Sequence, residues 1–367
     1  ASLTTGSTKQ ITQSYGNVFY SPPGYLVFLS DQVLMAQPFD AETGMLTDEP
    51  FQLGENPGFV PLTGQAAYSL SANGVLATGG GRVEARQYAW FDRQGSLLEI
   101  VTPPGNFFDI DLSPDGSRAV VQYDVGGDNS DIYVIDLVRK ELTQFTFTPE
   151  VEDNPIWSSD GSMILFDRFA VSKPAVVYKK RSTGAGTEEP LPYDGRLSDW
   201  SNDGRYILFY AQGSGDITYA DLNDGGKLTH YLATSATELY GHFSPNGKYV
   251  AYSSNESGIF EIYVQTFPEP GGKWRVSEGG GSQPEWRSDG KELFYIASDR
   301  TLMATQTSTN REFTYTAPKR LFRTQVDDFD APNRYVVSND GTRFLVNIPA
   351  GNSGGNPVTI TVNWLEG

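Results

Sequence analysis

Four ionisable side chains occupy one common position in this sequence, two residues before the first residue of a repeated tetrapeptide. They are Asp111, Asp199, His242 and Glu285. Carboxylates and an imidazole held at one level could bind a small cation, or a ligand that donates hydrogen bonds. Hydrogen bonding between neighbouring repeats would use the same residue types. The sequence therefore predicts either a cation- or ligand-binding pocket or a set of bridges between repeats.

A second set of acidic residues lies in polar segments that we expect to be loops. Such carboxylates would attract a cationic or amine-bearing ligand, a metal ion or a basic protein segment. This attraction would weaken with salt, because exposed charges are screened. The alternative is a solvated acidic rim that favours solubility. The residues of this predicted rim are Asp124, Asp128, Glu152, Asp153, Asp327, Asp328 and Asp330.

Motifs for catalysis are weak. Gly351-Asn-Ser353-Gly-Gly355 has the letters of a nucleophile elbow, but no histidine follows it and its glycine-rich surroundings favour a flexible loop. The segment from Asp109 to Gly116 offers oxygen ligands at alternate positions, as a calcium loop does, yet Gln122 stands where a bidentate glutamate is expected. We expect no catalytic residue, no metal and no cofactor; calcium or another cation in the pocket is the alternative.

Composition excludes several classes of function. The chain has 367 residues, with 27 Lys and Arg against 45 Asp and Glu, and this net charge of −18 disfavours a nucleic-acid partner. With no cysteine and two histidines, a zinc site of the usual kind is excluded. No apolar run approaches the roughly 18 residues of a membrane span. Because the chain starts with Ala1 and no leader, we expect a mature or excised fragment.

The tetrapeptide has the form Ser-X-Asp/Asn-Gly, and its glycines are spaced 42 to 51 residues apart, the period of a four-stranded propeller blade. Its proline, aspartate or asparagine, and glycine favour a tight hairpin turn. An apolar residue precedes each copy and short β-rich runs follow, with no helical periodicity. The pattern predicts an all-β propeller. The clearer copies end at Gly116, Gly161, Gly204, Gly247, Gly290 and Gly341, and the looser ones at Gly24 and Gly74.

We predict a single β-propeller domain over residues 1–367, with eight four-stranded blades, and seven or six as alternatives. Residues 7–12 are predicted to complete the last blade beside a strand in 358–364, which would close the ring and remove its exposed edges. The four ionisable residues would then line the central channel, and the recurring Trp157, Trp200 and Trp286 would pack between blades. The predicted blades begin near residues 15, 65, 107, 153, 196, 238, 281 and 333.

The hairpins resemble the WD40-like PD40 repeats of TolB-type propellers. Stretches such as Leu34-Met-Ala-Gln-Pro-Phe-Asp40 and Gly281-Ser-Gln-Pro-Glu-Trp286 resemble the C-terminal propeller of many bacterial Ser/Thr protein kinases. The resemblance covers essentially the whole chain, and it implies an extracytoplasmic or periplasmic location with tethering through an upstream segment. The sequence itself contains none of the kinase motifs.

Together these features favour a non-catalytic binding or sensor propeller, the extracytoplasmic part of a kinase-like receptor. A TolB-like periplasmic scaffold is the first alternative, and a propeller hydrolase or lyase is the second. The partner would be a protein or a small ligand, cationic if the acidic residues bind it. We expect a monomer that binds its partner on the face opposite the Ser-Pro-Asp-Gly hairpins, where the longer loops lie.

Overall fold

The computed structural model shows an all-β chain; the one helix in its described part is the 3-10 turn η1 (Leu222–Asp224). No helix among those residues is long and apolar enough to cross a membrane. The described residues are 11–12, 14, 17–22, 24–30, 33–55, 57, 59–60, 65–71, 74–79, 85–126, 129–169, 174–210, 215–309, 311–326, 333–351, 358–362 and 364.

The chain forms two compact units where the sequence predicts one domain. One unit is Ala85–Ala350, and the other combines Ala1–Glu84 with Gly351–Gly367. In the sequence, the first unit is one continuous segment, and the second unit is made of the segments before and after it. Each unit has its own hydrophobic clusters.

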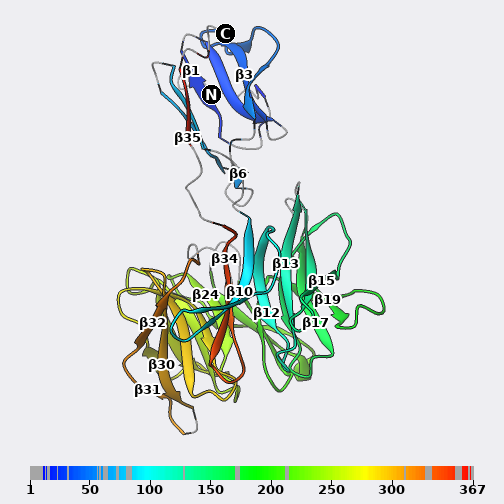
Figure 1. Cartoon of the computed structure of the whole chain (residues 1–367), viewed down its shortest axis with the longest axis vertical. Coiled ribbons are helices and arrows are strands. Elements are labelled where there is room, and N and C mark those ends of the chain that lie inside the picture. Colours follow the sequence, from blue (N-terminus) through cyan, green and yellow to red (C-terminus); the bar gives the residue numbers. More distant parts are fainter. Residues whose placement is uncertain are drawn as a thin grey trace. The chain divides into compact units, whose positions relative to one another are not determined.

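Six sheets fill the described part of Ala85–Ala350, and each leads from an inner strand to an outer one (Figure 1). The first three are β12 (Phe107–Leu112), β13 (Arg118–Gly126), β14 (Asn129–Asp136) and β15 (Glu141–Gln144); β16 (Val151–Trp157), β17 (Met163–Phe169), β18 (Val176–Arg181) and β19 (Glu189–Asp194); β20 (Arg196–Trp200), β21 (Tyr206–Tyr210), β22 (Ile217–Asp221) and β23 (Leu228–Leu232).

The other three sheets complete this unit. They are β24 (Glu238–Phe243), β25 (Tyr249–Ser254), β26 (Glu261–Thr266) and β27 (Lys273–Arg275); β28 (Gly281–Trp286), β29 (Glu292–Ala297), β30 (Thr301–Ser308), β31 (Thr314–Tyr315) and β32 (Lys319–Arg323); β33 (Tyr335–Val337), β34 (Arg343–Pro349), β10 (Arg86–Asp92) and β11 (Leu97–Ile100).

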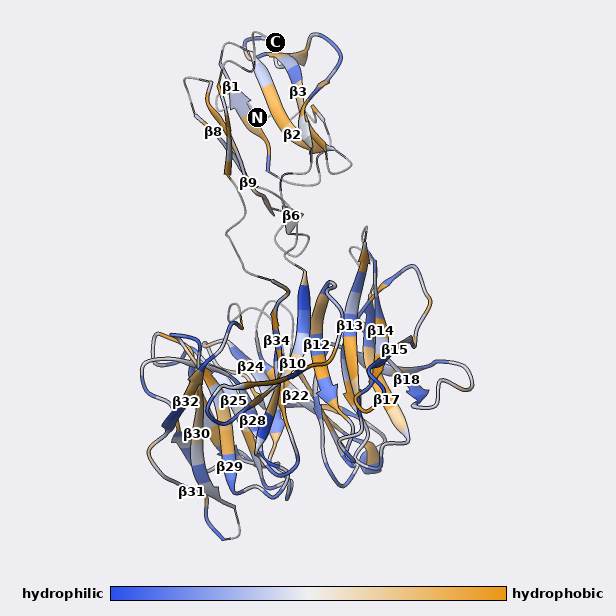
Figure 2. Ribbon diagram, viewed as in Figure 1, coloured by the Kyte–Doolittle hydropathy of each residue, from blue (hydrophilic) through white to orange (hydrophobic). Residues whose placement is uncertain are grey.

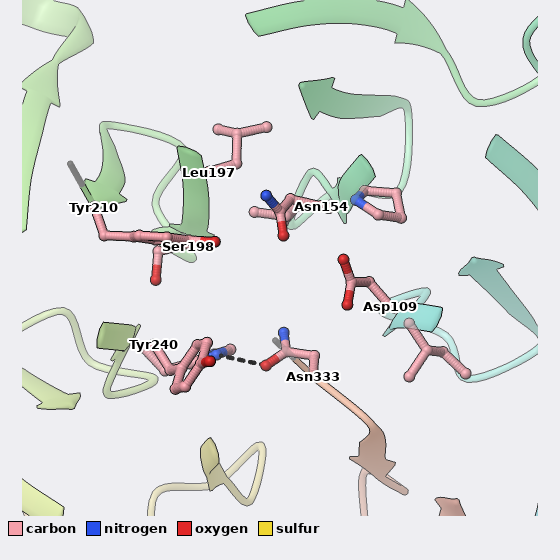
Figure 3. Close-up of a pocket in the computed structure, with 11 residues that line it drawn as sticks. Asp109, Asn154, Leu197, Ser198, Tyr210, Tyr240 and Asn333 are labelled. Atoms are coloured by element: carbon pink, nitrogen blue, oxygen red, sulfur yellow. Dashed lines mark hydrogen bonds between the residues drawn. The ribbon is translucent and has the colours of Figure 1, made fainter. Parts of the chain in front are cut away.

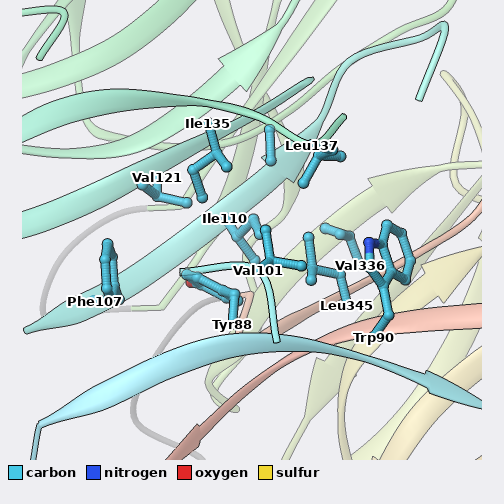
Figure 4. Packing of buried hydrophobic residues seen from close by; sticks show 11 residues of the cluster. Tyr88, Trp90, Val101, Phe107, Ile110, Val121, Ile135, Leu137, Val336 and Leu345 are labelled. Atoms are coloured by element: carbon cyan, nitrogen blue, oxygen red, sulfur yellow. The ribbon is translucent and has the colours of Figure 1, made fainter. Parts of the chain in front are cut away.

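The six sheets close into a ring. Inner strands contact one another in the cyclic order β12, β16, β20, β24, β28, β33 and back to β12. A hydrophobic cluster lies between each neighbouring pair of sheets. Figure 4 shows the cluster that joins the β12 sheet to the last sheet, where Tyr88 and Trp90 of β10 and Leu345 of β34 pack beside Phe107 and Ile110 of β12. The β-propeller predicted from the sequence is therefore present.

Ring closure differs from the prediction. Strands β10 and β34 pair in antiparallel register from Arg86↔Pro349 to Asp92↔Arg343, so residues 86–100 supply the outer half of the last sheet. Of the predicted closing segment, residues 7–10 lie outside the described residues, and Ile11 and Thr12 form no strand. Ala85–Ala350 thus contains six sheets, as in the six-bladed alternative, where eight blades are the first prediction. The difference arises because β10 and β11 pair with the last sheet and not with the second repeat.

The second unit contains the sheets of the first two repeats. Strand β35 (Val358–Thr361) pairs with β9 (Leu76–Gly79). The sequence pattern would instead pair β9 with β10, the next strand along the chain. The core holds Val27, Leu29, Tyr68 and Trp364, and Figure 2 shows β2 as a predominantly hydrophobic strand. Its strands are β1 (Phe19–Ser21), β2 (Tyr25–Ser30), β3 (Val33–Asp40), β4 (Met45–Leu46), β5 (Phe51–Glu55), β6 (Phe59–Val60), β7 (Gln65–Ala66), β8 (Tyr68–Leu70), β9 (Leu76–Gly79) and β35.

The tetrapeptide forms the predicted hairpin. The Ser113 hydroxyl donates to Asp115 Oδ1 at 2.7 Å, and the same oxygen accepts the Ser117 N–H at 2.9 Å. Gly116 has φ 68°, a left-handed conformation that glycine adopts without steric cost. These hydrogen bonds, led by the Ser117 N–H, lower the pKa of Asp115 to about 2. Asp115 therefore shapes a turn and is not placed to bind calcium with Asp109.

Candidate functional site

The inner strands are bulged where they line the centre of the ring. Pairing registers shift in β16 between Asp153 and Ile156, and in β24 between Leu239 and His242. Within these bulges Asn154 has φ 46° and Tyr240 has φ 56°, left-handed conformations that are uncommon outside glycine. A bulge re-aims side chains, and strained backbone of this kind often occurs at functional sites.

Two of the predicted channel residues form bridges between neighbouring sheets. Asp111 Oδ2 accepts the Trp157 N–H of the next inner strand at 2.7 Å. Asp199 Oδ2 accepts the Phe243 N–H in the same way, also at 2.7 Å. Burial raises the pKa of Asp111 to about 7 and that of Asp199 to about 8, against the opposing effect of the backbone donors. The structural alternative considered from the sequence, hydrogen bonding between repeats, describes both residues.

His242 and Glu285 meet at the same level of the channel. His242 Nε2 lies 3.2 Å from Asn333 Oδ1 and 3.9 Å from Glu285 Oε1. Burial lowers the pKa of His242 to about 4, so the imidazole is neutral at pH 7 and its Nε2–H donates to Asn333. Burial, together with the charges of Asp111 and Asp199, raises the pKa of Glu285 well above its usual value. The structure thus brings all four predicted channel residues together.

A hollow lies beside the channel residues, on the side away from the tetrapeptide hairpins. Figure 3 shows the residues that line it. Its volume is about 300 Å³, including space open to solvent. Asp109 and Asn154, each 5% exposed, lie in its wall, and His242 is the predicted channel residue that lines it. The lining residues are Asp109, Ile110, Asn154, Pro155, Ile156, Leu197, Ser198, Tyr210, Tyr240, His242 and Asn333.

Behind the hollow, a buried arginine is shared by two carboxylates. Arg196 pairs with Asp153 and lies 3.8 Å from Asp167 Oδ2. Asp167 Oδ2 also accepts from Asn154 Nδ2 and from the Leu197 N–H, both at 2.9 Å. Burial raises the pKa of Asp153 to about 6, with Arg196 opposing the shift. The charge of Arg196 is therefore already committed within the protein.

The predicted acidic rim is only partly described. Glu152 and Asp153 are buried, at 0% and 4% exposure, and pair with Arg168 and Arg196. Their expected place on an exposed rim is therefore corrected: both belong to β16, and arginines from other strands cover them. Asp124 is half-buried. Asp128, Asp327, Asp328 and Asp330 lie outside the described residues.

Among the described residues of the hollow, Ser198 bonds to the backbone and not to His242. The Ser198 hydroxyl donates to the Gly241 carbonyl at 2.8 Å, and no hydrogen bond joins it to His242. Among the residues that the structure describes, no group of three or more His, Cys, Asp or Glu side chains is placed to hold a metal ion. Ser353 of the predicted elbow-like motif lies outside the described residues.

Sequence reasoning did not identify the residues of this hollow as a site. A signal was available, because the position two residues before the predicted channel layer is polar in most repeats of the ring. It holds Asp109, Asn154, Leu197, Tyr240, Gln283 and Arg334.

Comparisons with known proteins agree with this architecture. A closed ring of four-stranded antiparallel sheets defines a β-propeller. Residues 95–267 match the family model described as PD40, TolB beta propeller domain, in agreement with the resemblance of the hairpins to PD40 repeats.

A relative and several solved structures are similar to this chain, and the structure from Agrobacterium tumefaciens supports the same assignment of fold. An uncharacterised protein of Agrobacterium fabrum is 24% identical over 213 residues, 50% of this chain and 68% of the relative. The putative TolB of Agrobacterium tumefaciens aligns with a TM-score of 0.56 at 16% identity, covering 73% of this chain and 99% of that one. TolB of Acinetobacter baumannii aligns at 16% identity with a TM-score of 0.48, covering 90% of this chain and 79% of that chain.

Proposed function

We propose that this chain is a binding module whose propeller engages a protein or small-ligand partner at the hollow. One observation carries the proposal: polar side chains that are almost fully buried converge there, and one of their acceptor atoms, Asn154 Oδ1, has no hydrogen-bond partner among the described residues. Unsatisfied buried polar atoms are costly, and they are rare in folded proteins unless a water, ion or ligand completes them.

The proposed role is non-catalytic. The nucleophile and base that covalent catalysis requires are not paired in the hollow, where Ser198 bonds to a backbone carbonyl and His242 donates to an amide. A rigid ring instead provides a fixed surface at one end of its inner strands. This end lies opposite the hairpins, which are alike from repeat to repeat.

We further propose an extracytoplasmic, monomeric sensor module tethered through an upstream segment to a kinase domain. The hairpins and the Gly281–Trp286 stretch support this context through the resemblance described above. A TolB-like periplasmic scaffold is the second proposal, supported by the family match of residues 95–267. The complete reading frame separates the two, because only the first requires an upstream kinase domain.

Hydrogen–deuterium exchange with the purified chain tests the binding site. Envelope proteins would be captured on the immobilised chain, and a purified partner would then be added to the chain in solution. We expect protection in β12, β16 and β24 around the hollow. Protection confined to the hairpins at 113–117, 158–162 and 201–205 would contradict the proposed face.

A further inference from the structure

The hollow contains a buried carboxylate that the charges of Arg334 and Arg196 reach, although neither arginine forms an ion pair with it. Asp109 is 5% exposed and accepts a hydrogen bond from the Asn154 backbone, yet in the described part of the chain it forms no ion pair. Asp153 and Asp167, by contrast, share Arg196. A buried carboxylate without such a partner is unfavourable as an anion. Asp109 therefore lacks a paired arginine such as the one that Asp153 and Asp167 share.

A second acceptor is held in place beside it. The Asn154 side chain is buried, and its Nδ2 donates to Asp167 Oδ2 at 2.9 Å. This bond fixes the amide so that Oδ1 is the end left without a partner. Figure 3 shows this oxygen and the Asp109 carboxylate directed into the same space. The two oxygens favour a ligand group that carries several N–H donors.

Aromatic rings complete the wall opposite Asp109. Tyr210 and Tyr240 both line the hollow, and their ring centroids lie 6.3 Å apart in an edge-to-face arrangement. Figure 3 shows them across the space from Asp109. Aromatic rings and a carboxylate around one small space form an environment that attracts an ammonium group, through its charge and through the ring quadrupole.

Anionic ligands are disfavoured at this place. Arg196 is committed to two carboxylates, and Arg334 lies over the Phe108 ring at 4.9 Å with its Nη1 3.5 Å from the Phe107 carbonyl. The neighbouring channel residues Asp111, Asp199 and Glu285 add three carboxyl groups. These groups lie close together, because the charge of Asp111 raises the pKa of Asp199, and the charges of both raise the pKa of Glu285. Hydrogen-bond acceptors thus dominate the surroundings of the hollow.

We propose that the hollow binds a primary ammonium group, with Asp109 as its ion-pair partner and Asn154 Oδ1 as a second acceptor. The inference deepens the proposed function and rests on it. The group would belong either to a small amine or to a lysine side chain of a partner protein. The small size of the hollow admits the ammonium head, and the rest of the ligand lies outside.

Binding should strengthen as pH rises from 6 to 8. Burial raises the pKa of Asp109 to about 7, with Arg334 and Arg196 opposing the shift and Asp153 adding to it. Tyr88, Tyr210 and His242 also face Asp109, but none of the three changes charge in this range, since the tyrosine pKa values are raised and that of His242 is lowered. An alkylammonium remains charged throughout. Asp109 ionisation alone should raise the affinity up to about tenfold, and the ionisation of Asp111 and Asp199, whose pKa values burial raises to about 7 and about 8, acts in the same direction.

Titration of the full chain with simple probes tests the inference. The probes are butylammonium, its uncharged analogue 1-butanol, and Nα-acetyl-lysine methylamide, followed by ligand-observed NMR. We expect saturable binding of butylammonium at pH 8 and at least tenfold weaker binding of butanol. Asp109→Asn should weaken butylammonium binding about 10- to 100-fold, because a charge-assisted hydrogen bond is lost. Asp131→Asn, which removes a 3%-exposed carboxylate outside the hollow, should change it less than twofold.

The comparison of butylammonium with butanol needs no variant, so the inference stays testable if Asp109→Asn does not fold. Equal affinity for the two probes, or no binding of butylammonium, overturns it. Tenfold tighter binding of the lysine derivative than of butylammonium supports a protein-borne amine, and equal binding supports a small amine. If butylammonium fails to bind while a partner still protects β12, β16 and β24, the ammonium inference falls and the proposed function stands.

Discussion

Replacing Asp199 by asparagine tests the bridges between inner strands. Asp199 accepts the Trp200 and Phe243 N–H groups, one on each carboxylate oxygen, both at 2.7 Å. Asparagine keeps one acceptor and turns an NH₂ group toward the other donor. The change loses one bond between β20 and β24 and leaves a buried N–H unsatisfied, at a cost of about 1–3 kcal/mol. For a unit of this size that lowers the melting temperature by about 2–10 °C.

The pH dependence of this cost makes the prediction sharper. Burial raises the pKa of Asp199 to about 8 from an ordinary 3.8, so between these values the folded chain holds a proton that the unfolded chain has released. The Asp199 contribution to stability is therefore greatest at acid pH and declines as pH rises toward 8. Asparagine cannot titrate. The destabilisation caused by Asp199→Asn should accordingly be larger at pH 5 than at pH 8.5.

Urea denaturation of both proteins at pH 5, 7 and 8.5 measures this difference. Asp299→Asn serves as a pH-independent control, because hydrogen bonds with Arg320 and Thr301 lower the pKa of Asp299 to about 2 and keep it ionised at all three pH values. The cost of Asp299→Asn should therefore be the same at pH 5, 7 and 8.5. If Asp199→Asn costs the same at every pH, or more at pH 8.5, then Asp199 is stabilised as an anion and the reasoning about its burial is refuted.

Three further predictions concern the ring. Leu345→Ala should cost about 2–5 kcal/mol by leaving a cavity in the cluster that closes it, whereas Val138→Ala at an 80%-exposed position should be nearly neutral; equal urea midpoints would contradict closure by β10 and β34. Gly204→Ala should cost about 1 kcal/mol through its φ of 72° alone, since nothing lies within 4 Å of an added Cβ, and an unchanged midpoint would argue against the left-handed turn. Residues 85–350 expressed alone should unfold cooperatively, as followed by near-ultraviolet circular dichroism, because they contain every strand of the ring; a non-cooperative transition would show that the ring needs the other unit.

Much of the fold is readable in the sequence because the hairpin chemistry is local. Ser158 and Asp160 repeat the Ser113 and Asp115 contacts, and Trp157 and Trp286 pack between sheets as predicted. Ring closure is not readable in this way. β10 and β35 are both short strands that fit beside β9 or β34, and local pattern does not identify the partner of a strand that pairs across the sequence.

The candidate site was predicted one layer away from the hollow. Repeat alignment found Asp111, Asp199, His242 and Glu285, which the structure indeed brings together. It could not show that Asp111 and Asp199 bond to backbone N–H groups, or that Asp109 lacks an ion pair. Those facts depend on the bulges at Asn154 and Tyr240, and on arginines that arrive from other strands. Neither the bulges nor the positions of these arginines can be predicted from the local sequence.

The measurement closest to the central claim is the titration of the Asp109 carboxyl carbon by NMR in the full chain, with and without butylammonium. The account predicts that the pKa of Asp109 is near 7 in the free protein and falls when butylammonium is added, because the bound cation favours the ionised carboxylate. A pKa near the ordinary 3.8 that is unchanged by butylammonium would contradict it.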